Sequence, residues 1–194
     1  MISLFIDTSL SDVSIALVKD GKLLSKINNN IPGEHSIYVT KYIDDILKKC
    51  KLSPKDVNDI IVINGPGSFT GIRIGVTIAK MFAYLKKIRI VSITSLLARV
   101  IGVHSNYVLS TIDAKHDNYY IGLYDENYNK IVEKFANIKE LEEMIKMYSP
   151  SVVDTSKEYD IEAIVKYTKK LPAENPHAVN PIYLKLPEAM EKKW

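Results

Sequence analysis

The chain has 194 residues, 46% of them apolar, which is enough to bury the core of one large domain or of two small lobes. Its 26 basic and 23 acidic residues leave a net charge of +3, too small a surplus to predict nucleic-acid binding by itself. Cys50 is the single cysteine, which excludes an intrachain disulfide and a multi-cysteine zinc site. The apolar run from Met1 to Ile6 is too short for a signal peptide or a membrane span, so we expect a cytoplasmic protein.

The first half of the chain predicts three antiparallel strands followed by alternating helices and strands. The runs that predict these first strands are Ile2–Ile6, Val13–Val18 and Lys22–Ile27, before a break at Asn28-Asn29-Asn30. Apolar residues at helical spacing then predict a helix from His35 to Cys50. The remaining predicted elements are a strand at Ile60–Ile63, a helix to about Lys86, a strand at Ile88–Ile93 and a short helix from Ser95.

The second half of the chain, from about Asn106, repeats this order. The predicted strands are Tyr107–Ile112, Tyr119–Tyr124, Lys130–Phe135 and Ser151–Val153, and the predicted helices are Glu140–Met147 and Ile161–Lys170. Three strands, a helix, a strand and a helix thus appear twice, which predicts an α/β fold of two duplicated actin-like lobes, the second one truncated. We expect an N-terminal lobe over residues 1–104 and a smaller C-terminal lobe over residues 105–194.

A glycine-rich turn, Gly65-Pro66-Gly67-Ser68-Phe69-Thr70-Gly71, lies between a predicted strand and a predicted helix. Such a turn exposes backbone N–H groups at the positive end of a helix, where an anion or the backbone of a partner can approach. Steric demands explain it equally well. Gly65 and Gly67 permit positive φ, Pro66 sets the bend, and Ser68 or Thr70 caps the helix.

Two helices of the first half carry more apolar surface than one core contact needs. In the first helix, apolar residues from Tyr38 through Val39 and Ile43 to Leu47 cover about half of the circumference. The helix after the glycine turn has a bulky face (Ile74, Ile78, Met81, Phe82 and Leu85) beside a small-residue face (Gly75, Ala79 and Ala83). Small residues let another helix approach closely. The two helices either pack on each other within one lobe or form an intermolecular bundle.

The residues that could carry chemistry give weak signals. Asp7 ends the first strand, where an actin-like ATPase places a carboxylate for metal and phosphate, but the following turn, Ser9-Leu10-Ser11-Asp12, lacks glycine. Asp7 is therefore equally suited to capping its own turn. The residues that a phosphate or nucleotide site would use are Asp7, Thr8, Ser9, Gly65, Gly67 and Ser68.

Metal and serine-hydrolase chemistry are not expected. The four histidines, His35, His104, His116 and His177, fall at no spacing that places two imidazoles on one helix face. Ser68 does not lie in a Gly-x-Ser-x-Gly elbow, since residue 70 is threonine. The charged cluster of Asp113, Lys115, His116 and Asp117 is typical of a solvated turn.

Several segments together resemble one family. They are Ile6-Asp7-Thr8-Ser9, Glu34-His35-Ser36, the eleven residues from Gly65 to Gly75, Ser92-Ile93-Thr94-Ser95-Leu96, and Pro181-Ile182-Tyr183-Leu184-Lys185. The chain resembles the TsaB family, also called YeaZ, whose fold is actin-like (ASKHA, ribonuclease H-like). It departs from the family in a short second lobe, in Lys185 where arginine is commoner, and in a tail from Glu188 to Trp194 without a counterpart.

The resemblance implies a non-catalytic accessory subunit of the bacterial machinery that makes threonylcarbamoyladenosine in tRNA. It implies a heterodimer with the catalytic paralogue TsaD through the N-terminal lobe, a TsaE-like ATPase that joins the pair, and a homodimer when TsaD is absent. It implies tRNA contact only through the complex and no membrane. No cofactor is expected, with ATP or ADP at the lobe cleft or at the complex interface left open. The expected partner-binding residues are His35, Tyr38, Val39, Tyr42, Ile46, Gly75, Val76, Ala79, Lys80 and Ala83.

Two other readings compete with this one. The first is a free-standing ATP-dependent kinase or peptidase of the same fold, whose activity would depend on Asp7. The second is a direct tRNA binder, which needs a basic stripe. The residues that could form such a stripe are Lys48, Lys49, Lys51, Lys86, Lys87 and Arg89, provided that folding brings them together.

Overall fold

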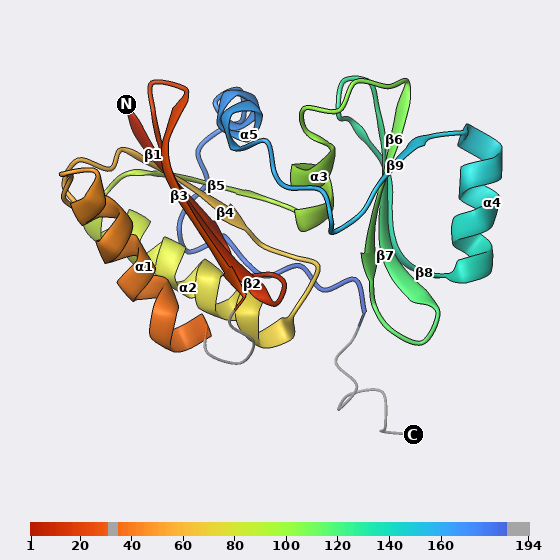
Figure 1. Cartoon of the computed structure of the whole chain (residues 1–194), viewed down its shortest axis with the longest axis horizontal. Coiled ribbons are helices and arrows are strands. Elements are labelled where there is room, and N and C mark those ends of the chain that lie inside the picture. Colours follow the sequence, from red (N-terminus) through yellow and green to blue (C-terminus); the bar gives the residue numbers. More distant parts are fainter. Residues whose placement is uncertain (31–34, 186–194) are drawn as a thin grey trace.

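The computed structural model describes residues 1–30 and 35–185, with the backbone alone for residues 35 and 36. Two mixed β-sheets form its framework (Figure 1). The strands of the first sheet are β1 (Ile2–Asp7), β2 (Asp12–Lys19), β3 (Lys22–Asn30), β4 (Asp59–Ile63) and β5 (Arg89–Ile93). They lie in the order β3-β2-β1-β4-β5, with β1 antiparallel to β2 and parallel to β4.

The second sheet repeats the topology of the first. Its strands are β6 (Tyr107–Asp113), β7 (Asn118–Asp125), β8 (Lys130–Asn137) and β9 (Ser151–Val153), in the order β8-β7-β6-β9. Here β6 is antiparallel to β7 and parallel to β9, as β1 is to β2 and β4. The predicted duplication is thus confirmed in the strand order. Within the described residues, the second sheet has four strands to the five of the first.

The helices cover both faces of the first sheet (Figure 1). α1 (His35–Lys49) and α2 (Phe69–Lys86) lie side by side on one face, and α5 (Ile161–Thr168) lies on the other. α3 (Ser95–Val100) lies between the two sheets, and α4 (Ile138–Tyr148) packs on the outer face of the second. α5 lies in the second half of the sequence, after the expected lobe boundary between residues 104 and 105, yet it packs on the first sheet. Of the helices that the structure describes, none has the length and apolarity to cross a bilayer.

Central position explains the apolar run of β1. All six residues of this strand are buried, because the sheet is covered on both faces. Successive side chains alternate between the faces, so Leu4 and Ile6 join the core beneath α1 and α2 whereas Phe5 joins the core beneath α5.

The predicted break at Asn28-Asn29-Asn30 is wrong. β3 continues through these residues, which pair with Ser14, Val13 and Asp12 of β2. Asn30 Nδ2 also donates to Asp12 Oδ1 across 2.6 Å. β3 is an edge strand, and its last three residues are exposed, so their polar side chains remain hydrated although the backbone is paired. The other predicted elements are found, with ends shifted by a few residues.

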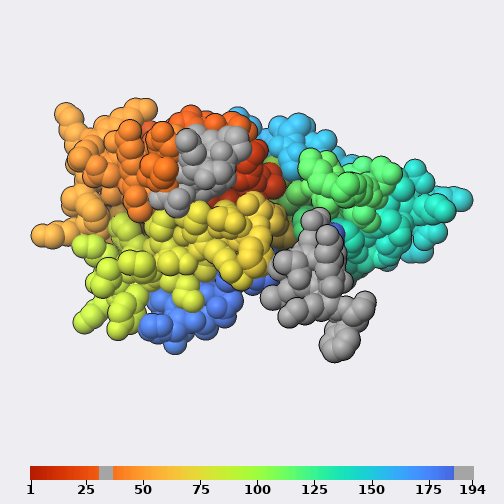
Figure 2. Space-filling model, turned by 90° about the horizontal axis from the view of Figure 1, so that it is seen from below, coloured from red at the N-terminus to blue at the C-terminus, as the bar shows by residue number. Residues whose placement is uncertain are grey.

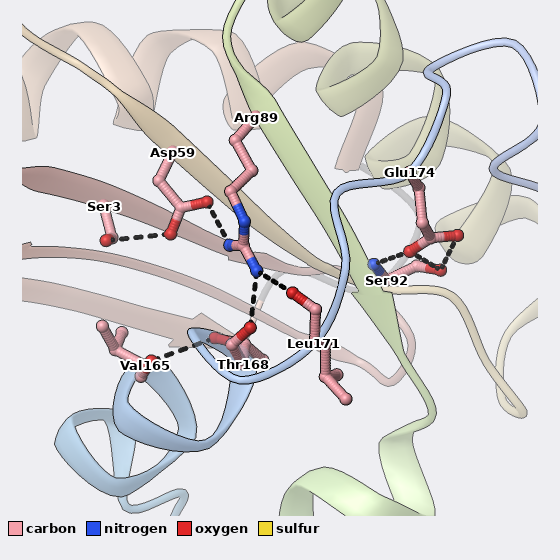
Figure 3. A network of polar contacts seen from close by, with 8 residues as sticks. All are labelled: Ser3, Asp59, Arg89, Ser92, Val165, Thr168, Leu171 and Glu174. Atoms are coloured by element: carbon pink, nitrogen blue, oxygen red, sulfur yellow. Dashed lines mark hydrogen bonds and ion pairs between the residues drawn. The ribbon is translucent and has the colours of Figure 1, made fainter.

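The segment after α5 is fastened to the first sheet by a charged network (Figure 3). Arg89 Nη1 pairs with Asp59 Oδ1 across 2.6 Å, and Arg89 Nη2 donates to the carbonyl oxygens of Thr168 and Leu171. Further along, the carboxylate of Glu174 accepts hydrogen bonds from Ser92. The network thereby holds the segment along β5 from its first residue, Arg89, and the chain then reaches the glycine turn, where the N–H of Ile182 donates to the carbonyl oxygen of Asn64.

Candidate functional site

The glycine turn is packed tightly against neighbouring backbone. A Cβ on Gly67, whose φ is +153°, would lie 2.0 Å from the carbonyl oxygen of Ser9. The N–H of Ser68 donates to that same oxygen across 2.6 Å. A Cβ on Gly65 would lie 2.4 Å from the carbonyl oxygen of Ile182. These positions need glycine because other chain segments approach them closely, which is the steric alternative.

The start of α2 shows why serine follows the two glycines. Ser68 is the N-cap of this helix, and its hydroxyl accepts the N–H of Gly71. On the other side of the turn, Ser95 donates to Pro66 through its hydroxyl and to Gly65 through its N–H. The turn therefore ties together β4, α2 and α3.

Asp7 caps its own turn and is also covered by a distant residue. Its Oδ1 accepts the N–H of Ser9 at 2.7 Å, and its Oδ2 accepts the hydroxyl of Tyr159 at 2.8 Å. Burial first, and then the charge of Asp7, raise the pKa of Tyr159 well above its usual value, which keeps the phenol protonated as a donor. The six predicted phosphate-site residues lie together at and just beyond the ends of β1 and β4, where both carboxylate oxygens of Asp7 accept hydrogen bonds.

A cavity of about 200 Å³ opens beside Asp7 and contains cationic side chains that sequence reasoning missed. Arg99 lines it, is 5% exposed, and has an Nε without a partner among the described residues. Lys157 also lines it, and burial lowers the pKa of its amine. A third cation of the lining, Lys26, is already paired with Glu158 at 2.9 Å, so Arg99 and Lys157 are the cations here that are better placed to bind a phosphate oxygen. No local pattern marks them, since Arg99 and Lys157 are more than ninety residues from Asp7 in the chain.

Among residues 1–30 and 35–185, no group of three or more His, Cys, Asp or Glu side chains is arranged to hold a metal ion. The charged turn between β6 and β7 is exposed, and Asp113 Oδ1 there accepts the N–H of Lys115. Its local hydrogen bond is what a solvated turn needs.

The small-residue face of α2, which the partner hypothesis placed at an intermolecular surface, is turned toward the sheet. The small-residue face points into the chain: a Cβ on Gly75 would lie 2.3 Å from Thr8 Oγ1, and Ala79 and Ala83 are fully buried. The physical reason is the close approach of α2 to the end of β1, where Thr8 Oγ1 donates to the carbonyl oxygen of Gly71. The small residues therefore serve packing on the sheet. Of the bulky face, Met81 and Leu85 are exposed, whereas Ile74, Ile78 and Phe82 are partly buried against the core.

The placement of α2 and α1 narrows the predicted partner surface. Six of its ten residues are buried within the chain and need correction as direct contacts: Val39, Ile46, Gly75, Val76, Ala79 and Ala83. The partly exposed ones are Tyr38, Tyr42 and Lys80, and the side chain of His35 lies outside the described part of the structure. The rings of Tyr38 and Tyr42 stack with centroids 5.6 Å apart.

The exposed apolar side chains of α2 form a strip, which we call the α2 strip and define as Met81, Tyr84 and Leu85. They are 58%, 59% and 68% exposed. Figure 2 shows α2, in yellow, between α1, in orange, and the C-terminal segment, in blue. A groove of about 280 Å³ lies between the strip and this segment, where the rings of Tyr84 and His177 are 4.9 Å apart. The sequence interpretation named Met81 and Leu85 as bulky residues but did not assign them to the partner surface.

Of the six residues that could form a basic stripe for direct tRNA binding, two are paired with carboxylates of the chain. Arg89 points inward to Asp59, whose side chain is fully buried. Lys48 pairs with Asp44 one turn earlier on α1. Lys49, Lys51, Lys86 and Lys87 are exposed.

The sequence of this chain is similar to the sequences of known proteins. A family model described as "TsaD: tRNA N6-adenosine threonylcarbamoyltransferase" matches residues 29–170. The tRNA threonylcarbamoyladenosine biosynthesis protein TsaB of Bacillus subtilis is 36% identical over 126 residues, which are 64% of this chain and 55% of that protein. The match thus spans about half the length of this relative. The TsaB of Buchnera aphidicola from Schizaphis graminum is 31% identical over 154 residues, 75% of this chain and 73% of that protein.

Solved structures extend the match over almost the whole chain. YeaZ from Pseudomonas aeruginosa superimposes with a TM-score of 0.78 at 20% identity, over 94% of this chain and 99% of that one. At this identity the likeness shows the fold alone, which is that of YeaZ and agrees with the predicted α/β architecture. Together with the sequence matches, it shows that the chain belongs to the TsaB/YeaZ family.

Proposed function

We propose that the chain is a non-catalytic accessory subunit of the machinery that forms threonylcarbamoyladenosine in tRNA. In this proposal it pairs with a TsaD-like paralogue, helps to recruit a TsaE-like ATPase, and forms a homodimer when alone. The names of its relatives support the pathway, since each matched TsaB is a tRNA threonylcarbamoyladenosine biosynthesis protein. The threonylcarbamoyltransferase model that matches residues 29–170 supports a partner of the same fold.

The α2 strip is the observation that carries the proposed pairing. Three large apolar side chains within five residues of one helix are more than half exposed, next to a groove. Contiguous exposed apolar surface of this kind marks interaction sites. Ile37, which is 65% exposed, lies on α1, the helix that packs beside α2 on the same face of the sheet. A paralogue with equivalent helices could bury this surface by helix packing.

Co-purification with the TsaD-like paralogue from the same organism tests the pairing. The double change Met81→Glu, Leu85→Glu puts two charges on exposed positions, so the lone chain should fold with an unchanged unfolding midpoint and the pair should be lost. Met147→Glu is the matched control, since Met147 is 74% exposed on α4, at the far side of the second sheet. A pair that survives the double change would place the interface elsewhere.

The role in modification needs a separate measurement. Reconstituted tRNA modification with the TsaD-like and TsaE-like proteins should require this chain. The variant with both changes on α2 should not support modification, whereas the Met147→Glu variant should support it. Full modification without the chain would exclude the accessory role.

A bulky residue at Ala79 would not distinguish a lost interface from a damaged fold, because Ala79 is fully buried and the substitution would disturb the core.

A further inference from the structure

A second cavity, of about 400 Å³, lies between the two halves of the chain. Its walls come from the carboxyl ends of β4 and β5, from β7 and β8, and from α3 and α5. The residues on which the following argument depends are Asn64, Thr94, Tyr124, Lys130 and Glu133. Apolar and aromatic side chains, among them Leu97, Leu171 and Tyr128, form most of the remaining lining, together with the polar residues Ser92 and Asn129.

Glu133 places a carboxylate in this cavity with incomplete compensation of its charge. Its side chain is 7% exposed, and its Oε1 accepts the hydroxyls of Thr94, at 2.6 Å, and Tyr124. Its Oε2 faces the Nζ of Lys130 at 3.9 Å, too far for a hydrogen bond, and the Lys130 side chain is 62% exposed. A buried carboxylate is stable only when its lone pairs and its charge are satisfied, so a further donor at Oε2 would be favourable.

Asn64 supplies a second acceptor without a donor. The residue is 5% exposed, and its Nδ2 donates to Ser92 Oγ and to the carbonyl oxygen of Asn180, both at 3.2 Å. The Asn180 carbonyl can only accept, so it determines which end of the amide faces it. Asn64 Oδ1 then has no hydrogen-bond partner among the described residues. An orphaned buried acceptor of this kind calls for a donor from outside.

We propose that this cavity binds a small primary amine carried on an apolar or aromatic body. A protonated amine has three donors and a positive charge, which match the acceptor atoms of Glu133 and Asn64 and the partly compensated charge of the carboxylate. The body would lie against Leu97, Leu171 and the rings of Tyr128 and Tyr167, whose centroids are 5.9 Å apart. A cavity that is largely apolar with a few convergent polar groups is the usual form of a small-molecule site. The site does not depend on the proposed pairing, since the α2 strip does not line it.

Binding of 2-phenylethylamine to the full chain tests the proposal, with 2-phenylethanol as the neutral control of the same shape. Titration calorimetry should give saturable binding of the amine and an affinity for the alcohol that is weaker by about tenfold or more. Methyl NMR of the wild-type chain should show amine-dependent shifts at Leu97, Leu171 and Ile182, which line the cavity. No saturable amine binding, equal affinity for the alcohol, or shifts confined to other methyl groups would overturn it.

Two variants test whether the negative charge of Glu133 is the group that binds the amine. Glu133→Gln keeps the length of the side chain and an acceptor for Thr94 and Tyr124 but removes the negative charge, so amine affinity should fall by about tenfold or more. Glu126→Gln is the matched control, because Glu126 is exposed in the turn between β7 and β8 and does not line the cavity. Equal loss in both variants, or none in Glu133→Gln, would contradict the assignment. If Glu133→Gln fails to fold, the methyl shifts of the wild-type chain decide the result.

Discussion

The hydroxyl of Tyr159 lies 2.8 Å from Oδ2 of Asp7, so a loop of the second half of the chain closes over the end of the first strand. The Tyr159 ring packs edge-on against Phe5, and the Arg99 guanidinium lies 4.8 Å from its centroid. Tyr159 thus joins the core beneath α5 to the turn that an actin-like ATPase would use for phosphate. In this structure the carboxyl group of Asp7 has a structural partner from within the chain.

Tyr159→Phe should destabilise the fold while leaving it intact. The ring keeps its packing on Phe5, but Asp7 loses a donor in a buried position, which costs about 1–3 kcal/mol of unfolding free energy. Urea denaturation measures the loss. Tyr148→Phe is the control, since the Tyr148 hydroxyl makes no hydrogen bond to a described residue. A loss no larger than that of the control would show that the contact with Asp7 contributes nothing.

Stability should fall above about pH 10, the usual pKa of a tyrosine side chain. Burial raises the pKa of Tyr159 and of Tyr124 above their usual value of 10.0, with the charges of Asp7 and Glu133 adding to the respective shifts. The unfolded chain therefore releases these protons first as the pH rises, and the folded state is progressively disfavoured. Each tyrosine contributes a slope of about 1.4 kcal/mol per pH unit between its unfolded and folded pKa.

Tyr159→Phe provides the control for this pH dependence. Urea denaturation at several pH values above 10.0, the unfolded reference, should give a shallower slope for the variant than for the wild-type chain. Below that pH the two slopes should coincide, because the phenol is protonated in both states. Parallel curves throughout the alkaline range would mean that Tyr159 ionises as easily in the folded chain as in the unfolded one.

Gly75→Ala should destabilise the chain although alanine favours helices. The gain in helix propensity is about 1 kcal/mol, but the new Cβ would lie 2.3 Å from the Oγ1 of the fully buried Thr8. Overpacking of this kind costs about 1–3 kcal/mol. Adding Thr8→Ala removes the clashing atom and should recover part of the loss, measured as a double-mutant cycle. Additive effects of the two changes would show that Gly75 and Thr8 do not compete for space.

Arg89→Met should be among the most damaging changes to the charged network of Figure 3. It leaves the fully buried carboxylate of Asp59 with the hydroxyl of Ser3 as its remaining described partner. Breaking a buried pair from one side costs about 3–5 kcal/mol, and the carbonyl oxygens of Thr168 and Leu171 also lose their donor. Unfolding free energy should recover in part when Asp59→Asn is combined with Arg89→Met. Lys48→Met, which breaks an exposed pair with Asp44, should change little.

The order of strands and helices and their duplication could be predicted from the sequence. Local hydrophobic periodicity sets these elements, and the continuous apolar run of β1 already indicates a strand covered on both sides. The N-cap at Ser68, one of the two candidates that the sequence offers, is local as well, whereas the close approach of Ser9 and Ile182 to Gly67 and Gly65 is a tertiary feature. The prediction failed at Asn28-Asn29-Asn30, because an edge position can keep a polar strand paired that local composition marks as a break.

Tertiary structure decided which faces and side chains are available for function. Periodicity shows that α2 has a small face and a bulky face, but the space left beside Thr8 determines that the small one is buried. The contacts of Tyr159 with Asp7 and of Glu133 with Thr94 join residues 152 and 39 positions apart, so no local pattern announces them. The sequence by itself determined the fold and the family. Which groups meet, and which remain without a partner, depended on how the two halves pack together.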